Sequence, residues 1–170
     1  VLPSTLDDVI LTASLKLNDW SRVIKVRGES QIEHVDGRMD SLSIEPEDAN
    51  AYQPSVQAIL DADIVVLGPG SLYTSILPNL MVKGIADALR ATDAFIIYVC
   101  NVATQPVETE EYTVAEHVMA LENHIGRGVF QAVIANNVYP KGNANGDTDY
   151  VLPVPENHEI FQRYDVFSTD

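Results

Sequence analysis

The sequence has little positive charge and only one cysteine. Ten Lys and Arg residues stand against 25 Asp and Glu residues, which gives a formal net charge of −15 at pH 7. A nucleic-acid groove needs a stripe of basic residues, so this balance argues against a nucleic-acid partner. Cys100 has no second cysteine with which to form an internal disulfide, and this fits a reducing compartment such as the cytoplasm.

Long apolar runs and the common phosphate-loop fingerprints are also missing. No apolar run approaches the roughly 18 residues that suggest a membrane span. The glycine-rich turn at 68–70 is followed by no Lys-Ser/Thr pair and lacks a third glycine, so it is neither a Walker A loop nor a dinucleotide fingerprint. The 170 residues, 46% of them hydrophobic, suit one globular domain with a sizeable core.

The central feature that is present is an apolar segment leading into a run of small and hydroxyl residues. Ile64–Leu67 contains three β-branched residues and predicts a strand buried on both faces. Gly68 and Gly70 allow a ligand to approach the backbone, and a helical pattern begins near Asn79. Such a turn offers backbone N–H groups to an anion. Local chemistry leaves two alternatives open: a phosphate or sugar site, and a plain tight turn.

The first 45 residues have the pattern of antiparallel strands. Strict alternation of apolar and polar residues over 9–17 predicts a strand with one buried face, and 20–27 is its expected hairpin partner. The dipeptide Asp36-Gly37 predicts a second hairpin, between strands at 32–35 and 39–44.

From Pro46 onward, helical patterns alternate with buried strands. The strands are predicted at 64–67, 94–100 and 129–135. This alternation is typical of right-handed βαβ units, which build a parallel sheet. We therefore predict an α/β fold with a three-layer, Rossmann-like parallel sheet and a β-rich antiparallel N-terminal extension.

We expect this fold to form a single domain with three parts. Residues 1–45 are the extension, 46–138 the βαβ core, and 139–170 a loop-rich tail. In the tail, 140–149 has loop composition and 151–154 is a candidate for one more strand.

Polar residues follow the predicted strands at the edge where open parallel sheets bind ligands. Asn101, Thr104 and Gln105 follow the second strand and can hydrogen-bond a base, a ribose or a sugar hydroxyl, and Asn136–Asn137 follows the third. The alternative is that Asn101 caps its own turn and Gln105 is solvated.

The acidic and histidine residues of the second half have structural explanations. Glu108, Glu110 and Glu111 precede the helix that begins near residue 113, where the helix dipole favours negative charge; a metal site is the alternative. His117 and His124 lie seven residues apart and lack the i,i+4 spacing of a zinc helix, so we expect no metal site from this pair.

The run Gly68–Leu80 resembles the signature of the gluconeogenesis factor (YvcK-like) family, within the superfamily of CofD, the 2-phospho-L-lactate transferase. Tyr98–Thr109 agrees with it, as do shorter matches at 1–5 and 26–30, so the resemblance covers about residues 1–138. That family begins with a glycine-rich nucleotide-binding strand-turn-helix, which has no counterpart here. We therefore expect the chain to be the C-terminal portion of a longer protein.

The resemblance implies a cytoplasmic bacterial regulatory protein that binds a nucleotide-type ligand, above all a nucleotide sugar. It also implies a role in morphogenesis, cell-wall synthesis and growth on gluconeogenic carbon sources. The alternative is a CofD-like enzyme, which would transfer phospholactate from a guanylyl donor to a deazaflavin with Mg²⁺. Gly68–Leu72 departs from the Gly-Pro-Ser-Asn-Pro turn of that branch and favours the regulatory protein, without catalytic or metal-binding residues. Whether it forms a homodimer stays open.

The resemblance places the ligand-binding residues in three segments of the chain. Sequence chemistry alone would make Ser4 or Thr5 a cap or turn residue, and Tyr73 either stacks on a base or packs. The complete set is Ser4, Thr5, Gly68, Pro69, Gly70, Ser71, Tyr73, Thr74, Ser75, Asn79, Asn101, Thr104 and Gln105.

Overall fold

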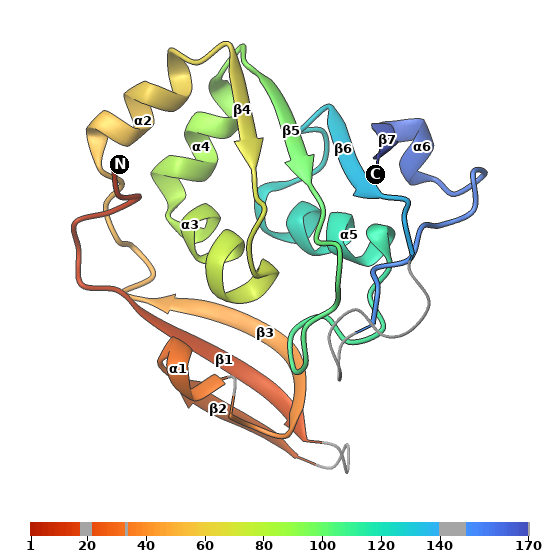
Figure 1. The fold of residues 1–170 in the computed structure, drawn as a ribbon. Coiled ribbons are helices and arrows are strands. Elements are labelled where there is room, and N and C mark those ends of the chain that lie inside the picture. The colour runs from red at the N-terminus through yellow and green to blue at the C-terminus, as the bar shows by residue number, and fades with distance from the viewer. Residues whose placement is uncertain (18–21, 33, 140–148, 170) are drawn as a thin grey trace.

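A computed structural model describes residues 1–17, 22–32, 34–139 and 149–169, which form two β-sheets (Figure 1). The antiparallel sheet has the strand order β2-β1-β3, and the parallel sheet has the order β4-β5-β6-β7. The predicted α/β class, with a parallel sheet and an antiparallel N-terminal extension, is confirmed. Within the described ranges, no helix is both long enough and apolar enough to cross a membrane.

The antiparallel sheet is built on β1 (Ile10–Leu17), which pairs with β2 (Val23–Arg27) and with β3 (Gly37–Glu45). The hairpin predicted between 9–17 and 20–27 is therefore confirmed. The strand predicted at 32–35 is wrong. The short helix α1 (Glu29–Ile32) occupies this region because Ile32 anchors it in the core, and β3 pairs with β1 instead.

The parallel sheet contains the three strands that were predicted in the core. These are β4 (Ile64–Leu67), β5 (Phe95–Val99) and β6 (Ala132–Asn136). Val65 pairs with Ile96, and Val99 pairs with Ile134, so the three strands are parallel neighbours as expected.

The tail differs from the prediction. Residues 151–154 form no strand, and only Tyr150 makes an isolated bridge, to Ala103. The fourth parallel strand is β7 (Asp165–Thr169), which follows α6 (Ile160–Arg163). β7 has only two apolar residues, Val166 and Phe167, between polar ones, so it lacks the continuous apolar run by which the other strands were predicted. Residues 140–148 of the predicted loop, and residues 18–21 at the predicted hairpin, lie outside the described residues.

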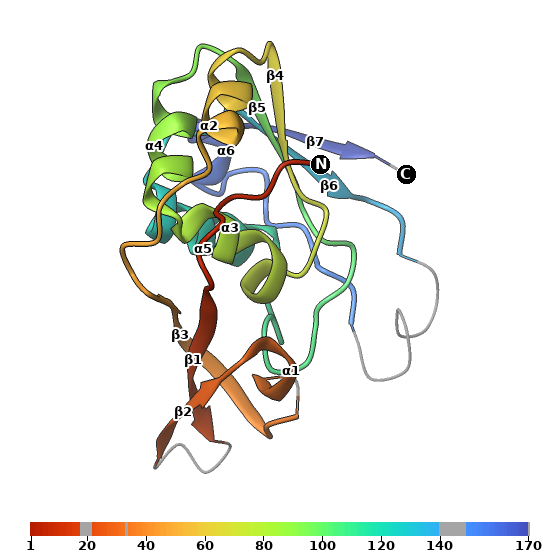
Figure 2. The same ribbon diagram turned by 90° about the vertical axis from the view of Figure 1, so that its left-hand side faces the viewer.

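The helices α2 (Gln53–Leu60), α4 (Lys83–Ala91) and α5 (Val114–Ile125) lie on one face of the parallel sheet (Figure 2). The strands follow one another in order across the sheet, and right-handed crossovers then place every connecting helix on the same side. The opposite face exposes four large apolar side chains: Ile64, Val66, Phe95 and Phe167. The prediction that the strand at 64–67 is buried on both faces is therefore wrong, because no helix among the described residues covers this face.

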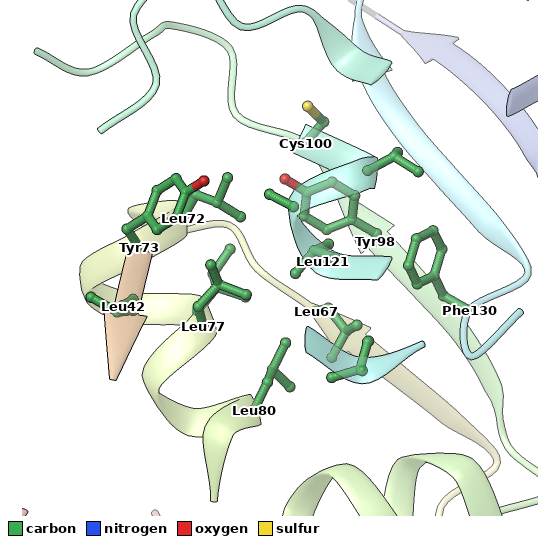
Figure 3. Packing of buried hydrophobic residues seen from close by; sticks show 14 of the residues in the cluster. Leu42, Leu67, Leu72, Tyr73, Leu77, Leu80, Tyr98, Cys100, Leu121 and Phe130 are labelled. Carbon is green, nitrogen blue, oxygen red and sulfur yellow. The ribbon is translucent and has the colours of Figure 1, made fainter. Parts of the chain in front are cut away.

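The segment after β4 forms a π-helical turn, η1 (Leu72–Ile76), which continues directly into α3 (Leu77–Met81). The sequence pattern predicted that the helix begins near Asn79, whereas the helical segment begins at Leu72. Figure 3 shows Leu72 and Leu77 pointing toward Tyr98 of β5 in the buried core. This packing fixes the turn between β4 and η1 against the end of β5.

Candidate functional site

Two turns meet at the carboxyl ends of the neighbouring strands β4 and β5. Gly68–Ser71 follows β4 and Asn101–Gln105 follows β5, and Gln105 Nε2 donates a hydrogen bond of 2.8 Å to Ser71 Oγ. A cavity of about 470 Å³ lies between the turns, and we call it the strand-end cleft. Six of the predicted ligand-binding residues line it: Pro69, Gly70, Ser71, Asn101, Thr104 and Gln105.

The two glycines of the first turn have different roles. Gly68 has a φ of +90°, and a Cβ there would lie 2.9 Å from the carbonyl oxygen of Val99. The backbone conformation at position 68 and the nearby carbonyl of Val99 therefore require a residue without a side chain. At Gly70 a Cβ would meet only Ser75 Cβ at 3.4 Å and Ile76 Cγ1 at 3.7 Å, which are ordinary contacts. Gly70 lines the strand-end cleft and contributes only backbone atoms to its wall.

Two carboxamides in the second turn have unpaired polar atoms. Asn101 Oδ1 and Gln105 Oε1 are buried and have no hydrogen-bond partner among the described residues. Buried polar atoms are nearly always paired, and an unpaired one costs about 1–3 kcal/mol. A carboxamide carries one acceptor and one donor group, so turning Gln105 over would still leave one of them unpaired. Both side chains therefore have hydrogen-bonding capacity that none of the described residues uses.

The side chain of Glu108 accepts two hydrogen bonds from residues at the start of η1. Its Oε2 accepts a hydrogen bond of 3.0 Å from the N–H of Tyr73, and its Oε1 accepts one of 2.7 Å from the Thr74 hydroxyl. The residue is 5% exposed. A carboxylate at this position matches the positive end of η1. The prediction that Glu108 serves the helix beginning near residue 113 is therefore wrong, because its partners lie on η1.

The loop that carries Gln105 and Glu108 is held against the antiparallel sheet. Met39 N–H donates to the carbonyl of Val107 at 2.8 Å, and Arg38 pairs with Glu111 at 2.9 Å and with Glu110 at 3.5 Å. Val107 has a φ of +69°, which is strained for a β-branched residue. The position of the strand-end cleft therefore depends on β3 as well as on the parallel sheet.

The segment from Gly68 to Asn79 also lines two adjoining cavities, of about 250 Å³ and about 490 Å³. Asn79 lines both, and Pro69 is shared between the smaller one and the strand-end cleft. Ser4 Oγ donates a hydrogen bond of 2.5 Å to Asn79 Oδ1, and the N-terminal segment forms part of the wall of the larger cavity. The predicted residues that line these two cavities are Ser4, Thr5, Gly68, Pro69, Thr74, Ser75 and Asn79.

Tyr73 and the third strand end lie away from these cavities. Tyr73 is buried, and its hydroxyl shares a hydrogen bond of 2.9 Å with that of Tyr112. Burial and this hydrogen bond raise the pKa of Tyr73 far above its usual range. It lines none of the three cavities, so the structure favours packing over stacking on a base. Asn136 Nδ2 bonds the carbonyl of Val138 in its own turn.

His117 and Cys100 are buried in the protein core. His117 Nδ1 donates to the carbonyl of Thr113 at 2.9 Å, and burial lowers the pKa of the imidazole. Burial raises the pKa of the Cys100 thiol to about 12. Among the described residues, no three His, Cys, Asp or Glu side chains are grouped so that they could hold a metal ion.

The charge around the three cavities is low. Of the residues that the structure describes, no Lys or Arg lines any of them, and Glu29 is the single charged residue in their walls. The groups that face a ligand are therefore backbone amides, hydroxyls and carboxamides.

Comparison with protein families gives one match over almost the whole chain. The profile described as "2-phospho-L-lactate transferase CofD" matches residues 1–161. The "Putative gluconeogenesis factor" of Clostridium acetobutylicum is 45% identical over 141 residues, which are 81% of this chain and 30% of that protein. The "Gluconeogenesis factor" of Bacillus subtilis is 39% identical over 137 residues, 81% of this chain and 42% of that protein.

Solved structures agree with these sequence matches. Two crystal structures of protein BH3568 from Bacillus halodurans, which is described as a member of the UPF0052 family, superpose with TM-scores of 0.87 and 0.86. The identities are 30% and 32%, and each match covers 99% of this chain and 54% or 55% of the other. The chain thus spans about half the length of these structures and less than half of the two curated relatives.

Proposed function

This chain belongs to the CofD family, and from that premise we propose that it acts as a gluconeogenesis factor and binds a nucleotide sugar at the carboxyl edge of its parallel sheet. The observation that carries the proposal is the hydrogen bond between Gln105 and Ser71, which joins two turns around the strand-end cleft. Open α/β sheets bind ligands at this edge. The names of the relatives support the same function.

The size of the site supports an extended ligand. Small-molecule sites usually have volumes of about 300–1,000 Å³. The strand-end cleft and the cavity beside Ser4 fall in this range, and the cavity between them shares Pro69 with one and Asn79 with the other. A ligand with a base at one end and a sugar at the other fits such a row better than a single ring does.

We further propose that the ligand is held between this chain and a second α/β unit. Parallel sheets are normally covered on both faces, whereas Ile64, Val66 and Phe95 are exposed here. The longer relatives contain enough additional residues for such a unit. Residues 1–170 would then bind a nucleotide sugar at least a hundredfold more weakly than a full-length relative, and would self-associate. Calorimetric titration and light scattering of both proteins test this, and a monomer with full affinity would contradict it.

The proposed role is regulatory, in the cytoplasm, and linked to cell shape and gluconeogenic growth. The alternative, a phospholactate transferase, has support from the description of the family profile. That reaction would use Mg²⁺, which proteins usually hold through one or two carboxylates together with the phosphates of the substrate. We expect no release of GMP from a lactyl-guanylyl donor in the presence of a deazaflavin. Release at catalytic rates would establish the enzyme instead.

A thermal-shift screen tests the proposed function. This chain and a full-length relative are each heated with UDP-glucose, GDP-mannose, ADP-glucose, NAD and GDP at millimolar concentration. A ligand that binds only the folded state raises the melting temperature by mass action. We expect at least one nucleotide sugar to do so, and no increase with any of them would contradict the proposal.

A further inference from the structure

The strand-end cleft differs chemically from a phosphate site. We infer that this cleft seats an uncharged hydrogen-bonding group of the ligand, a nucleobase or a sugar ring, and that the phosphates lie outside it. This inference rests on the proposed function and says which part of a nucleotide sugar the two turns bind.

Three of the backbone N–H groups at the start of η1 are already occupied. Phosphates commonly bind at helix N-termini, where N–H groups are free. At the start of η1 the N–H of Tyr73 donates to Glu108, and the N–H groups of Ser75 and Ile76 both donate to the carbonyl of Ser71 at 2.9 Å. The buried carboxylate of Glu108 thus lies at the end of η1 where a bound phosphate would otherwise accept hydrogen bonds. A phosphate bound at the same turn would be repelled by this like charge.

The walls of the cleft provide no compensating cation. Phosphate groups are typically bound through Arg or Lys side chains, which supply charge-assisted hydrogen bonds. In the part of the chain that the structure describes, neither residue type lines the strand-end cleft. The net charge of −15 raises the cost of bringing a further anion to this surface.

The side chains that remain available are neutral carboxamides. Asn101 and Gln105 each have a buried, unpaired oxygen, whereas the hydroxyl of Thr104 is already engaged with the backbone of Asp149 at 3.2 Å. Both residues line the cleft, and the terminal torsion of a carboxamide is soft, so we expect rotation on binding to turn a polar atom toward the ligand. Paired donor and acceptor atoms match the edge of a base, as they do in carboxamide recognition of adenine, or two neighbouring sugar hydroxyls.

Side-chain amide resonances report directly on this contact. We would record ¹⁵N spectra of the labelled protein and assign the two NH₂ groups by their loss in Asn101→Leu and Gln105→Leu. The probes are uridine, guanosine, methyl α-D-glucopyranoside and pyrophosphate, each at millimolar concentration. We expect a nucleoside or the glycoside to shift both NH₂ groups, and the active probe identifies the bound group as a base or a sugar. Pyrophosphate should leave both unchanged, and the exposed amide of Gln57 serves as the control.

The outcomes separate this inference from the proposed function. Shifts of both NH₂ groups with pyrophosphate would overturn the inference, and so would the absence of shifts with every nucleoside and glycoside. A nucleotide sugar that raises the melting temperature without shifting either NH₂ group would also overturn it, while leaving the proposed function standing. Failure of every nucleotide sugar in the thermal-shift screen would instead remove the proposed function.

Discussion

The hydroxyl of Thr74 donates a hydrogen bond of 2.7 Å to the carboxylate of Glu108, 34 residues further along the chain. The same carboxylate accepts the N–H of Tyr73, so one buried side chain fixes the start of η1. Because η1 continues the turn that lines the strand-end cleft, the shape of the cleft depends on this long-range contact.

Replacing Glu108 should therefore destabilise the fold. Glu108→Ala leaves the N–H of Tyr73 and the hydroxyl of Thr74 buried without an acceptor, and we expect it to lower the free energy of unfolding by about 2–4 kcal/mol. Urea denaturation followed by circular dichroism measures this change. The control is Glu111→Ala, because its side chain is 76% exposed and its ion pair with Arg38 should contribute less than about 1 kcal/mol. Equal effects of the two variants would contradict the role of Glu108.

The two glycines of the first turn should separate folding from binding. Gly68→Ala places a Cβ 2.9 Å from a backbone carbonyl at a positive φ, so it should lower stability. At Gly70 a Cβ meets no atom closer than 3.4 Å, so Gly70→Val should preserve the fold while adding side-chain atoms to a residue that lines the strand-end cleft. We expect Gly70→Val to weaken binding of a nucleotide sugar at least tenfold, or about 1.4 kcal/mol. Thermal melts and calorimetric titrations of both variants test this, and unchanged affinity in Gly70→Val would show that the turn is only structural.

Glu122 should hold the C-terminal elements in place. Its side chain is 4% exposed and accepts hydrogen bonds from Arg163 at 3.0 Å and from the hydroxyl of Tyr164 at 2.6 Å. Glu122→Ala removes both hydrogen bonds, from the last residue of α6 and from the residue before β7, and we expect a loss of about 2–4 kcal/mol in the free energy of unfolding. Glu159 also pairs with Arg163 but is 58% exposed, so Glu159→Ala should cost less than about 1 kcal/mol. Urea denaturation compares the two, and a reversed order would refute this assignment.

His117 should make stability depend on pH. Burial lowers the pKa of His117 in the folded state, so the neutral imidazole stabilises the fold above its unfolded pKa of about 6.5. This contribution is lost as the pH falls through the lower, folded pKa. We expect the unfolding free energy to decline between pH 7 and pH 5, and the decline to be smaller in His117→Gln than in the wild type. The exposed His34→Gln is the control, and an unaltered decline in His117→Gln would contradict the prediction.

Local patterns predicted the elements whose residues carry their own signal. The alternation in β1 and the apolar runs of β4 and β5 depend on neighbours in sequence. The strand predicted at 32–35 failed because Ile32 is buried by packing against elements elsewhere in the chain. No local pattern distinguishes the short helix α1 from a strand there.

The candidate site was predictable only in part, for the same reason. Sequence reasoning placed Ser71 and Gln105 at the ends of neighbouring strands, and the geometry of a parallel sheet brought them together. It misjudged Glu108 because its partners are more than 30 residues distant. The sequence left open whether Tyr73 stacks on a base or packs, because an aromatic ring in a signature gives no indication of the side to which it points.

The most direct test of the account is a calorimetric titration of Gln105→Leu with the nucleotide sugar that the thermal-shift screen identifies. Leucine retains the volume of the side chain but removes both its hydrogen bond to Ser71 and its contact with the ligand. Gln57→Leu, at an exposed position of α2, provides the matched control. We predict at least a tenfold loss of affinity in Gln105→Leu, or about 1.4 kcal/mol, and none in the control. Equal affinity of wild type and Gln105→Leu would contradict the claim that the ligand lies between the two turns.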